Sequence, residues 1–527
     1  MTDRARPFKR VLVANRGEIA VRIIRACREM GIESVAVYSD VDRFAAHVRA
    51  ADLALRIGPA PAAQSYLSID ALLAAARATH AEAIHPGYGF LAERAAFAAA
   101  VEDAGLAFVG PGSQAIAAVG DKLAARRLAI SVGVPVLPGT LEPVDGSDPA
   151  QLAAIVVAAE GIGYPLLVKA AAGGGGRGMR TVDRAEDLPE SVRAASGEAL
   201  AAFGDGAVYL ERQVQPARHI EVQLLGDATG RVIALGERDC SIQRRHQKLV
   251  EEAPAPGLTD AQRREVHDRA IRIAVAAGLR NAATAEFLFD TESRFWFLEV
   301  NARLQVEHGI TELISGVDIV HEQLSLAAGR PLSAEARAAG ERAGEPAGHA
   351  IEVRISLEDP ARGFLPLAGR IGRFTMPAGP GVRVDTAIEA GERVPSDYDP
   401  LVAKLMVHGS DRAVAIERLA RALDETEIGG VQTTLPFHRF VAVSPDFAAG
   451  RLSTGFVEDH WAGLAARQAA VGRALLAAGL ASFHGSPEPA ASTAPARAPG
   501  SGPSDATGWL AAARAEGVSR WPRGSGR

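Results

Sequence analysis

Cysteine is almost absent from this chain of 527 residues, which has only Cys27 and Cys240. The two are far apart and show no Cys-x-x-Cys spacing, so we expect neither a disulfide framework nor a zinc site. This usage fits a reducing compartment, and we expect a cytoplasmic protein. Cys240 could serve as a nucleophile, but no Cys/His/Asn framework accompanies it, and we interpret it as structural.

Long apolar runs and a large excess of charge are also missing. No apolar run reaches the length of a membrane helix, and the four apolar residues 11–14 are too few for the core of a signal peptide. The formal net charge is -6 and the pI is near 6.2, so no general attraction to nucleic acid is expected. A hydrophobic fraction of 48% is ordinary for a soluble globular protein. A chain of this length should form about three or four domains or subdomains.

The first 120 residues predict a Rossmann-like α/β domain. A short apolar strand at 11–14, an amphipathic helix at 18–30 and a second strand at 34–38 make a βαβ start, and further α/β pattern follows. A Gly-x-Gly-x-x-Gly sequence is missing after the first strand, so a dinucleotide site is not supported.

Four consecutive glycines at 173–176 stand between Lys169 and Arg177. Such a run can bring backbone N–H groups against a polyphosphate. A P-loop has its lysine after the glycines, so this is not a Walker A sequence. Strands predicted at 165–169 and 179–182 would make the run the tip of a hairpin, which suits a lid. On the glycines alone, a flexible surface turn remains the alternative.

Segments 284–289 and 295–300 predict a β-hairpin whose turn places Glu286 opposite Glu299. Like charges opposite one another repel, and the aromatic residues 295–297 indicate burial, so the pair needs a cation. Carboxylate and amide oxygens are hard ligands, which predicts Mg²⁺ or Mn²⁺ holding nucleotide phosphates.

The alternation of polar and apolar residues continues from this hairpin to residue 307. If the chain stays extended, one face carries Glu299, Asn301, Arg303, Gln305 and Glu307. A solvated edge would explain the alternation but not why these groups adjoin so aromatic a segment, and we favour a site. The basic cluster 237–248 could bind phosphate, or could be a solvated loop.

The last third of the chain changes in composition. Residues 333–348 are rich in Ala, Glu and Gly and predict a linker, and 349–461 predict a mostly β domain with one helix at 413–423. Residues 462–527 predict a largely disordered tail, above all at 485–507.

Seven motifs in order resemble the biotin carboxylases, members of the ATP-grasp superfamily, from about Lys9 to His460. They are residues 14–19, 85–91, 120–122, the glycine run, 237–256, 303–308 and 352–354. The resemblance implies an N-terminal α/β domain at 1–120, an ATP-grasp domain at 121–332 with a glycine-rich lid subdomain at about 138–212, and a C-terminal biotin carboxylase domain at 349–461.

The resemblance also implies an activity. The chain would carboxylate biotin with ATP and bicarbonate through carboxyphosphate, as the biotin carboxylase subunit of an acetyl-CoA or other acyl-CoA carboxylase. ATP, Mg²⁺ or Mn²⁺, bicarbonate and biotin are the implied cofactors and substrates. A Met-Lys-Met biotinylation motif is absent, so we expect the biotin carboxyl carrier protein and carboxyltransferase on other chains, and the family implies a homodimer.

Roles carry over to matching positions. The nucleotide would contact Lys122, Lys169, Gly175, Gly176, Glu211, Arg212, Gln213, Val214, His219 and His246, and the metal would contact Glu286, Glu299 and Asn301. Bicarbonate would be held by Lys248, Arg303, Gln305 and the backbone of Val306. Glu307 would be the general base, and Arg354 would stabilise the biotin enolate.

Three positions depart from the family pattern. Ala172 replaces a glycine that many members have, and Arg212 replaces a common lysine but keeps its charge. Gly309 stands where proline is usual, which predicts a looser chain after Glu307. Two alternatives stay open: another ATP-grasp ligase that joins a carboxylate to an amine, against which Glu307 and Arg354 argue, and a catalytically silent nucleotide-binding scaffold, which Gly309 alone supports.

Overall fold

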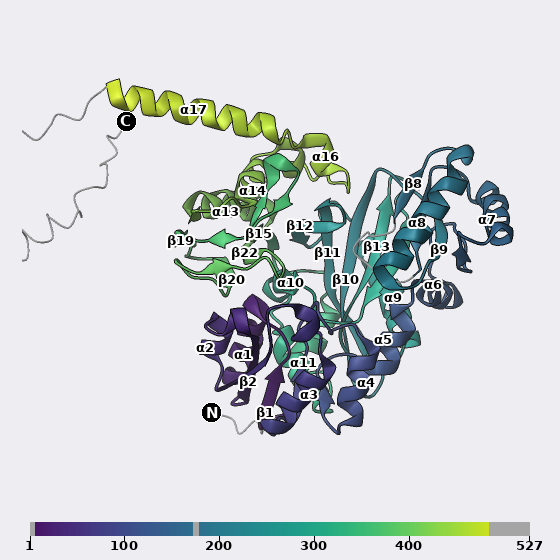
Figure 1. Cartoon of the computed structure of the whole chain (residues 1–527), viewed down its shortest axis with the longest axis horizontal. Helices are drawn as coiled ribbons and strands as arrows, with labels where there is room; N and C mark the ends of the chain where they lie inside the picture. The colour runs from purple at the N-terminus through teal and green to yellow at the C-terminus, as the bar shows by residue number, and fades with distance from the viewer. Residues whose placement is uncertain (1–5, 172–178, 484–527) are drawn as a thin grey trace, which may run out of the picture. The chain divides into compact units, whose positions relative to one another are not determined.

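The computed structural model describes residues 6–171 and 179–483 (Figure 1). The chain divides into two units, Met1–Ala466 and Arg467–Arg527, and the elements that carry the candidate site all belong to the first. The predicted glycine lid, with Gly175 and Gly176, and the predicted disorder at 485–507 lie outside the described residues.

The N-terminal part is built on a five-stranded parallel sheet, as the sequence predicts. In sheet order its strands are β3 (Leu53–Gly58), β2 (Glu33–Ser39), β1 (Arg10–Val13), β4 (Ala83–His85) and β5 (Ala107–Phe108). The helices of this part are α1 (Gly17–Glu29), α2 (Ala46–Ala50), α3 (Ile69–Ala78), α4 (Ala95–Asp103) and α5 (Ser113–Gly120). Val11, Leu12 and Val13 are wholly buried, which is typical of a central parallel strand covered on both faces.

An eight-stranded antiparallel sheet forms the middle of the first unit. In sheet order its strands are β14 (Phe295–Asn301), β13 (Asn281–Asp290), β10 (Ala217–Gly226), β11 (Val232–Arg244), β12 (Gln247–Ala253), β15 (His349–Ser356), β22 (Leu401–Gly409) and β20 (Val382–Thr386). The turn after β10 is held by Asp227, which accepts hydrogen bonds from the backbone and hydroxyl groups of Thr229. Apolar side chains of β10, β13 and β14 join those of the N-terminal helices in one hydrophobic core.

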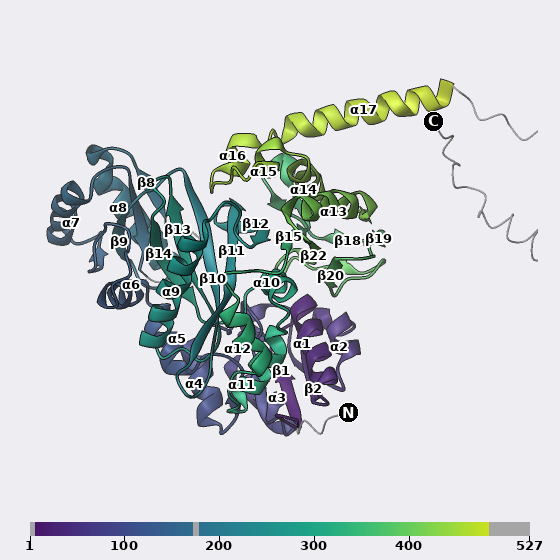
Figure 2. The same cartoon turned by 180° about the vertical axis from the view of Figure 1, so that it is seen from behind.

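Helices cover both faces of this sheet around β11. α9 (Asp260–Ala276) packs against one face of β11, and α12 (Ala334–Glu341) packs against the other, where its buried alanines share a core with Leu225 and Leu235 (Figure 2). α10 (His308–Ser315) also lies on the face opposite to α9, because Thr311 of α10 bonds Arg238 while His267 of α9 bonds the adjacent strand residue Glu237. The remaining helices here are α6 (Lys122–Ser131) and α11 (Ile319–Ala327).

The predicted linker at 333–348 is wrong for its first half, which forms α12. Ala336 and Ala339 of this helix are buried in the core shared with β11, because small side chains let the helix approach the strand closely. Beyond it, β15 pairs directly with β12, with Glu352 opposite Glu251. The C-terminal strands therefore continue the same sheet.

A separate four-stranded antiparallel sheet carries the base of the predicted lid. Its strands, in order, are β6 (Val144–Asp145), β9 (Ala207–Arg212), β7 (Leu166–Ala170) and β8 (Arg180–Val182), with helices α7 (Pro149–Ile162) and α8 (Leu188–Phe203). β7 and β8 pair as the predicted hairpin, with Leu166 opposite Val182.

The C-terminal part of the first unit adds short strand pairs and helices. The strands are β16 (Glu358–Asp359), β17 (Leu365–Pro366), β18 (Gly369–Arg370), β19 (Arg373–Thr375), β21 (Arg393–Val394) and β23 (Glu427–Gly429). The helices are α13 (Arg412–Glu425), α14 (Leu435–Ala442), α15 (Pro445–Ala448) and α16 (Phe456–His460). Their apolar side chains form a second core with β15 and β22.

The segment Leu464–Phe483 forms a helix, α17, which the composition-based prediction of a disordered tail missed (Figure 1). Its alanine and leucine content is high, and these residues have strong helix propensity. Among residues 6–171 and 179–483, no helix combines the length and apolar character needed to span a bilayer.

Candidate active site

The β13–β14 hairpin has the predicted register, with Glu286 directly opposite Glu299. Phe287, Phe295 and Phe297 are wholly buried, and the ring of Phe287 meets each of the other two edge-on. This aromatic layer anchors the hairpin in the core. The two carboxylates are thereby held on one sheet face.

Glu286 lies at the centre of a polar network. Its carboxylate is 2.9 Å from Lys248 Nζ and 3.0 Å from His219 Nε2, and it accepts hydrogen bonds from Asn301 Nδ2 at 2.8 Å and Gln305 Nε2 at 3.0 Å. Burial acts to raise the pKa of Glu286, but Lys248 and His219 outweigh it and hold that pKa well below its ordinary value. Side chains of the protein itself therefore supply positive charge to Glu286.

The negative charge of Glu299 is balanced less completely by nearby cations than that of Glu286. Burial, and then the charge of Glu286, raise its pKa, while Lys122 and Lys169 act in the opposite direction. Lys169 donates to Glu211 at 2.6 Å, and Glu211 also accepts from buried Arg126. The ammonium groups of Lys122 and Lys169 are thus both near enough to Glu299 to act on its pKa.

The predicted metal ligands fit a hard divalent cation. Glu286 and Glu299 oppose each other across the hairpin, and burial together with the charge of Glu286 raises the pKa of Glu299. Asn301 adds an amide to this pair. Donor atoms of His219, Glu221 and Glu286 also lie within 4.8 Å of one another. Oxygen donors of this kind suit Mg²⁺ or Mn²⁺.

The prediction that residues 299–307 stay extended is wrong. β14 ends at Asn301, and the chain then turns until α10 begins at His308. Leu304 is wholly buried in the N-terminal core, which draws the chain out of the strand direction. The turn still brings the predicted side chains together: Lys248 Nζ is 3.2 Å from Gln305 Oε1 and 2.7 Å from Glu307 Oε1. We call residues 302–309 the catalytic turn.

Glu307 is 1% exposed and lies between two cations. Lys248 contacts one carboxylate oxygen, and Arg354 Nη2 donates to the other at 2.8 Å. Burial acts to raise the pKa of Glu307, but Lys248 and Arg354 outweigh it and hold that pKa well below its ordinary value. Arg354 also donates from Nε to Glu251 at 2.6 Å, which fixes the guanidinium orientation. Glu307 is therefore ionised at neutral pH.

The other predicted anion-holding groups have different partners. Arg303 pairs with Glu93 at 2.8 Å and donates to Asn301 Oδ1, also at 2.8 Å. The backbone oxygen of Val306 accepts from Lys404 Nζ at 2.8 Å. The catalytic turn is thus tied to the N-terminal part through Glu93 and to β22 through Lys404.

Other predicted nucleotide-binding residues lie at the end of β9, directly after it, and in the β11–β12 turn. Arg212 donates to the backbone of Ile162 at 3.3 Å, and the Gln213 amide donates to Pro165 at 2.9 Å, with half-buried Val214 following. His246 is in the β11–β12 turn, where burial, and then the charges of Lys169, His219 and Lys122, lower its pKa.

The basic cluster 237–248 is not a loop, because 237–244 belong to β11 and β12 resumes at 247. Arg238 is wholly buried, pairs with Glu221, and donates to Gln223 at 2.9 Å and Thr311 at 2.8 Å. Sequence reasoning missed Glu221 and Gln223. The signal was available, because the polar residues of 219–223 alternate with apolar ones as on a strand with one polar face.

Cys240 is wholly buried beside this network, and burial raises the pKa of its thiol well above the ordinary value. A thiol in this setting stays protonated and unreactive, in agreement with the structural interpretation.

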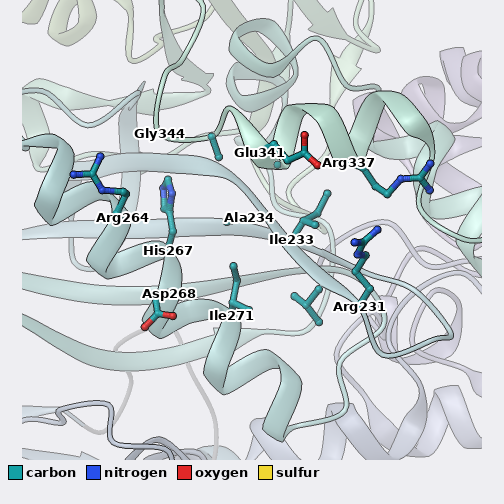
Figure 3. Close-up of a pocket in the computed structure, with 13 residues that line it drawn as sticks. Arg231, Ile233, Ala234, Arg264, His267, Asp268, Ile271, Arg337, Glu341 and Gly344 are labelled. Atoms are coloured by element: carbon teal, nitrogen blue, oxygen red, sulfur yellow. The ribbon is translucent and has the colours of Figure 1, made fainter.

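A crevice of about 380 Å³ lies elsewhere, between β11, α9 and α12. Figure 3 shows Arg264 and His267 from α9 on one side and Arg337 and Glu341 from α12 on the other. Within the described part of the chain, its lining includes none of the predicted site residues. The candidate site is the polar network of Glu286 and Glu307.

Comparison with known proteins shows the family to which the chain belongs. Three family models match in order: the N-terminal domain of biotin carboxylase at 7–116, the ATP-binding domain of the carbamoyl-phosphate synthase L chain at 121–335, and the C-terminal domain of biotin carboxylase at 352–459. A biotin carboxylase of Haemophilus influenzae is 47% identical over 451 residues, which cover 86% of this chain and 98% of that protein. The chain belongs to the biotin carboxylase family.

Two further relatives show the range of this family. The biotin-dependent acyl-coenzyme A carboxylase alpha3 subunit of Mycobacterium leprae is 46% identical over 456 residues, 86% of this chain and 74% of that protein. The biotin carboxylase domain dimer of Hydrogenobacter thermophilus 2-oxoglutarate carboxylase, solved with MgADP, ADP and bicarbonate, matches with a TM-score of 0.81 at 44% identity. That match covers 86% of this chain and 98% of the other. Members of the family are ATP-dependent ligases.

Proposed function

We propose that this protein carboxylates biotin on a separate carrier protein, using ATP and bicarbonate and forming carboxyphosphate. One observation carries the proposal: buried Glu307 is held ionised between Lys248 and Arg354, beside the facing carboxylates of the β13–β14 hairpin. A base, two fixed cations and a cation-binding acid pair in one network match the needs of bicarbonate activation. A nucleotide scaffold without catalysis would not need a buried base.

Glu307 is the group that deprotonates bicarbonate in this proposal. Bicarbonate is a weak nucleophile, and it needs a positioned base and neutralisation of its charge. Lys248 supplies positive charge within 2.7 Å of Glu307, and Gln305 adds an amide to the same network. Arg303 and the Val306 backbone complete the proposed anion site. The Glu307 carboxylate takes the hydroxyl proton as the bicarbonate oxygen attacks the γ-phosphorus of ATP. The bond between this phosphorus and the β,γ-bridging oxygen breaks, and ADP leaves with the bridging oxygen.

Lys122 and Lys169 would meet the nucleotide phosphates, with Gly175, Gly176 and the residues 211–214, His219 and His246 around the rest of the nucleotide. Phosphoryl transfer depends on positioning and cations more than on covalent help from the protein. Mg²⁺ or Mn²⁺ at Glu286, Glu299 and Asn301 would neutralise phosphate charge. The partial compensation of Glu299 supports this assignment.

Arg354 would act in the second half of the reaction. Carboxyphosphate breaks down to CO₂ and phosphate, the phosphate takes the ureido proton of biotin, and the resulting nitrogen nucleophile attacks CO₂. The positive charge of a guanidinium can stabilise the enolate oxygen through a charge-assisted hydrogen bond. Glu251 holds Arg354 in place at 2.6 Å, and contact with Glu307 puts both halves of the chemistry in one site.

For the later steps we propose carrier and carboxyltransferase subunits on other chains, with an acyl-CoA such as acetyl-CoA as the final acceptor. Similarity to the Mycobacterium leprae acyl-coenzyme A carboxylase subunit supports this acceptor, and the 2-oxoglutarate carboxylase domain gives a 2-oxo acid as the acceptor to test against it. That domain was solved as a dimer, which supports a homodimer here.

The test is ATP hydrolysis by the purified protein with and without bicarbonate and free biotin. We expect hydrolysis to require bicarbonate and to rise with biotin, and we expect Glu307→Gln to abolish it while keeping the melting temperature. Glu265→Gln, on the exposed side of α9, is the matched control and should behave as wild type. Turnover that ignores biotin and requires an amine acceptor would instead identify another ATP-grasp ligase.

A further inference from the structure

Strand β22 contacts the catalytic turn on both sides of Glu307. Lys404 Nζ donates to the Val306 backbone oxygen at 2.8 Å, just before the base. Met406, two residues along the same face of β22, packs against Gly309, just after the base. Lys404 and Met406 are both wholly buried.

The contact at Gly309 leaves no room for a side chain. A Cβ atom at position 309 would lie 2.4 Å from Met406 Sδ and 3.3 Å from Met406 Cε. Real Cβ atoms essentially never approach another atom so closely, so either Met406 or the turn would have to move. The prediction of a looser chain at Gly309 is therefore wrong: Gly309 is buried in the first turn of α10, and Met406 fills the space beside it.

Met406 has little freedom to move aside. Its side chain is enclosed in a small apolar cluster with Ala253, Ile310, Ile314 and Ala350. On the strand, it stands opposite Glu352 of β15 and Arg383 of β20. Methionine is adaptable in general, but a close-packed neighbourhood transmits a displacement to its contacts. Among the contacts of Met406, the one nearest to the proposed chemistry is its contact with Gly309 of the catalytic turn.

Helix α10 is also held in place at Glu312, about one turn after Gly309. Arg383 Nη1 donates to Glu312 at 2.6 Å, and Arg22 Nη2 donates to the other oxygen of Glu312 at 3.0 Å. With α10 tethered at Glu312, a displacement at residue 309 is directed back toward Glu307 rather than along the helix.

We propose that Gly309 and Met406 form a mutually required pair that sets the position of Glu307, so that Met406 is a positioning residue for the base. The inference rests on the proposed function, because Glu307 must act as the base. It names a residue of β22, more than ninety positions from Glu307 in the chain, as part of what places the base.

A double-mutant cycle tests the pair, using Gly309→Ala, Met406→Ala and the variant with both changes. Alanine is a better helix former than glycine, so propensity alone predicts that Gly309→Ala is harmless. We expect instead a kcat about 100-fold lower, the scale that a displaced catalytic group produces. Met406→Ala opens the space that a Cβ at position 309 needs. The double variant should recover kcat about tenfold over Gly309→Ala, since contacting residues show non-additive effects.

The readouts separate positioning from general destabilisation. The KM for ATP should stay near that of wild type in Gly309→Ala, because Lys122 and Lys169 lie on other elements. Gly197→Ala is the matched control and should leave kcat and KM unchanged, because Gly197 is an exposed helix glycine whose added Cβ would have nothing within 4 Å. Thermal melting of all variants accompanies the kinetics.

Wild-type kcat in Gly309→Ala, or effects of the two substitutions that simply multiply, would overturn the pair while leaving the proposed function intact. If ATP hydrolysis by the wild-type protein does not depend on bicarbonate, the proposed function is wrong, and the proposed role of the Gly309–Met406 pair is wrong as a consequence. If Gly309→Ala does not fold, recovery of folded protein by adding Met406→Ala supports the pair, and failure to recover overturns it.

Discussion

Glu286 and Glu299 face each other in the hairpin, yet their surroundings push their ionisation in opposite directions. Glu286 contacts Lys248 and His219, so its pKa is lowered, whereas the pKa of Glu299 is raised by burial and by Glu286 itself. An uncompensated buried charge is costly, and a bound cation removes that cost. At the scale of single residues, this difference supports the proposal that the pair binds a cation.

Glu286→Gln tests this preparation. The amide keeps the size of the side chain but removes the charge that a cation would meet, so we expect the KM for magnesium-ATP to rise about tenfold with the fold retained. Initial rates at varied magnesium-ATP, together with thermal melting, give both quantities. Glu265→Gln again serves as the surface control. An unchanged KM would show that Glu286 does not serve the metal.

At the scale of elements, the sequence predicted the hairpin well because its signals are local. Alternating apolar residues fix the two strands, and the turn residues 290–294 fix the register, so Glu286 opposite Glu299 followed from spacing alone. The parallel N-terminal sheet was equally predictable from its βαβ pattern. These signals reach only as far as neighbouring strands.

Where tertiary packing decides the path of the chain, prediction from the sequence failed. The polar alternation after Asn301 resembles a strand, but burial of Leu304 and the start of α10 turn the chain instead. The basic cluster that contains Arg238 was left open between a phosphate site and a solvated loop, because residues 237–248 alone do not show that Glu221 and Gln223 contact Arg238. The space at Gly309 depends on Met406, a residue of a different segment, and could not be read from its own neighbours.

Phe297→Ala tests the aromatic anchor of the hairpin. Phe297 is wholly buried and its ring lies 5.9 Å from that of Phe287, so truncation should lower the free energy of unfolding by about 3–5 kcal/mol. Urea unfolding measures this loss. Because Glu299 is two residues further along the strand, the KM for magnesium-ATP should rise as well. Phe44→Ala, at a site where Phe44 is 78% exposed, should change neither quantity.

At the scale of the whole molecule, buried histidines link stability to pH. Burial lowers the pKa of His85 and His308 to about 3, and that of His47 and His438 to about 4, from an ordinary value of 6.5. Below the ordinary value, the unfolded chain therefore binds more protons than the folded protein at these positions. Their contribution is complete above the ordinary pKa and is lost as the pH falls toward the folded values.

We expect the free energy of unfolding to fall on acidification below the ordinary pKa of histidine, by up to about 1.4 kcal/mol per pH unit for each such histidine. Urea unfolding across this range measures the slope. His47→Gln removes one of these titrating groups and should make the slope shallower. An unchanged slope in that variant would show that His47 is not among the groups responsible.

The pairing of β12 with β15 has a consequence for how the chain can be recombined with others. The ATP-binding family model ends at residue 335 and the C-terminal model begins at residue 352, but the sheet continues from β12 to β15. Glu251 of β12 lies opposite Glu352 of β15 and accepts a hydrogen bond from Arg354. A chimaera joined between the two strands would need a foreign strand with the same register and the same guanidinium. Without them, β12 becomes a bare sheet edge carrying an unpaired acid, which invites aggregation. A crossover at the exposed residue Ala462 would leave the pairing of β12 with β15 intact.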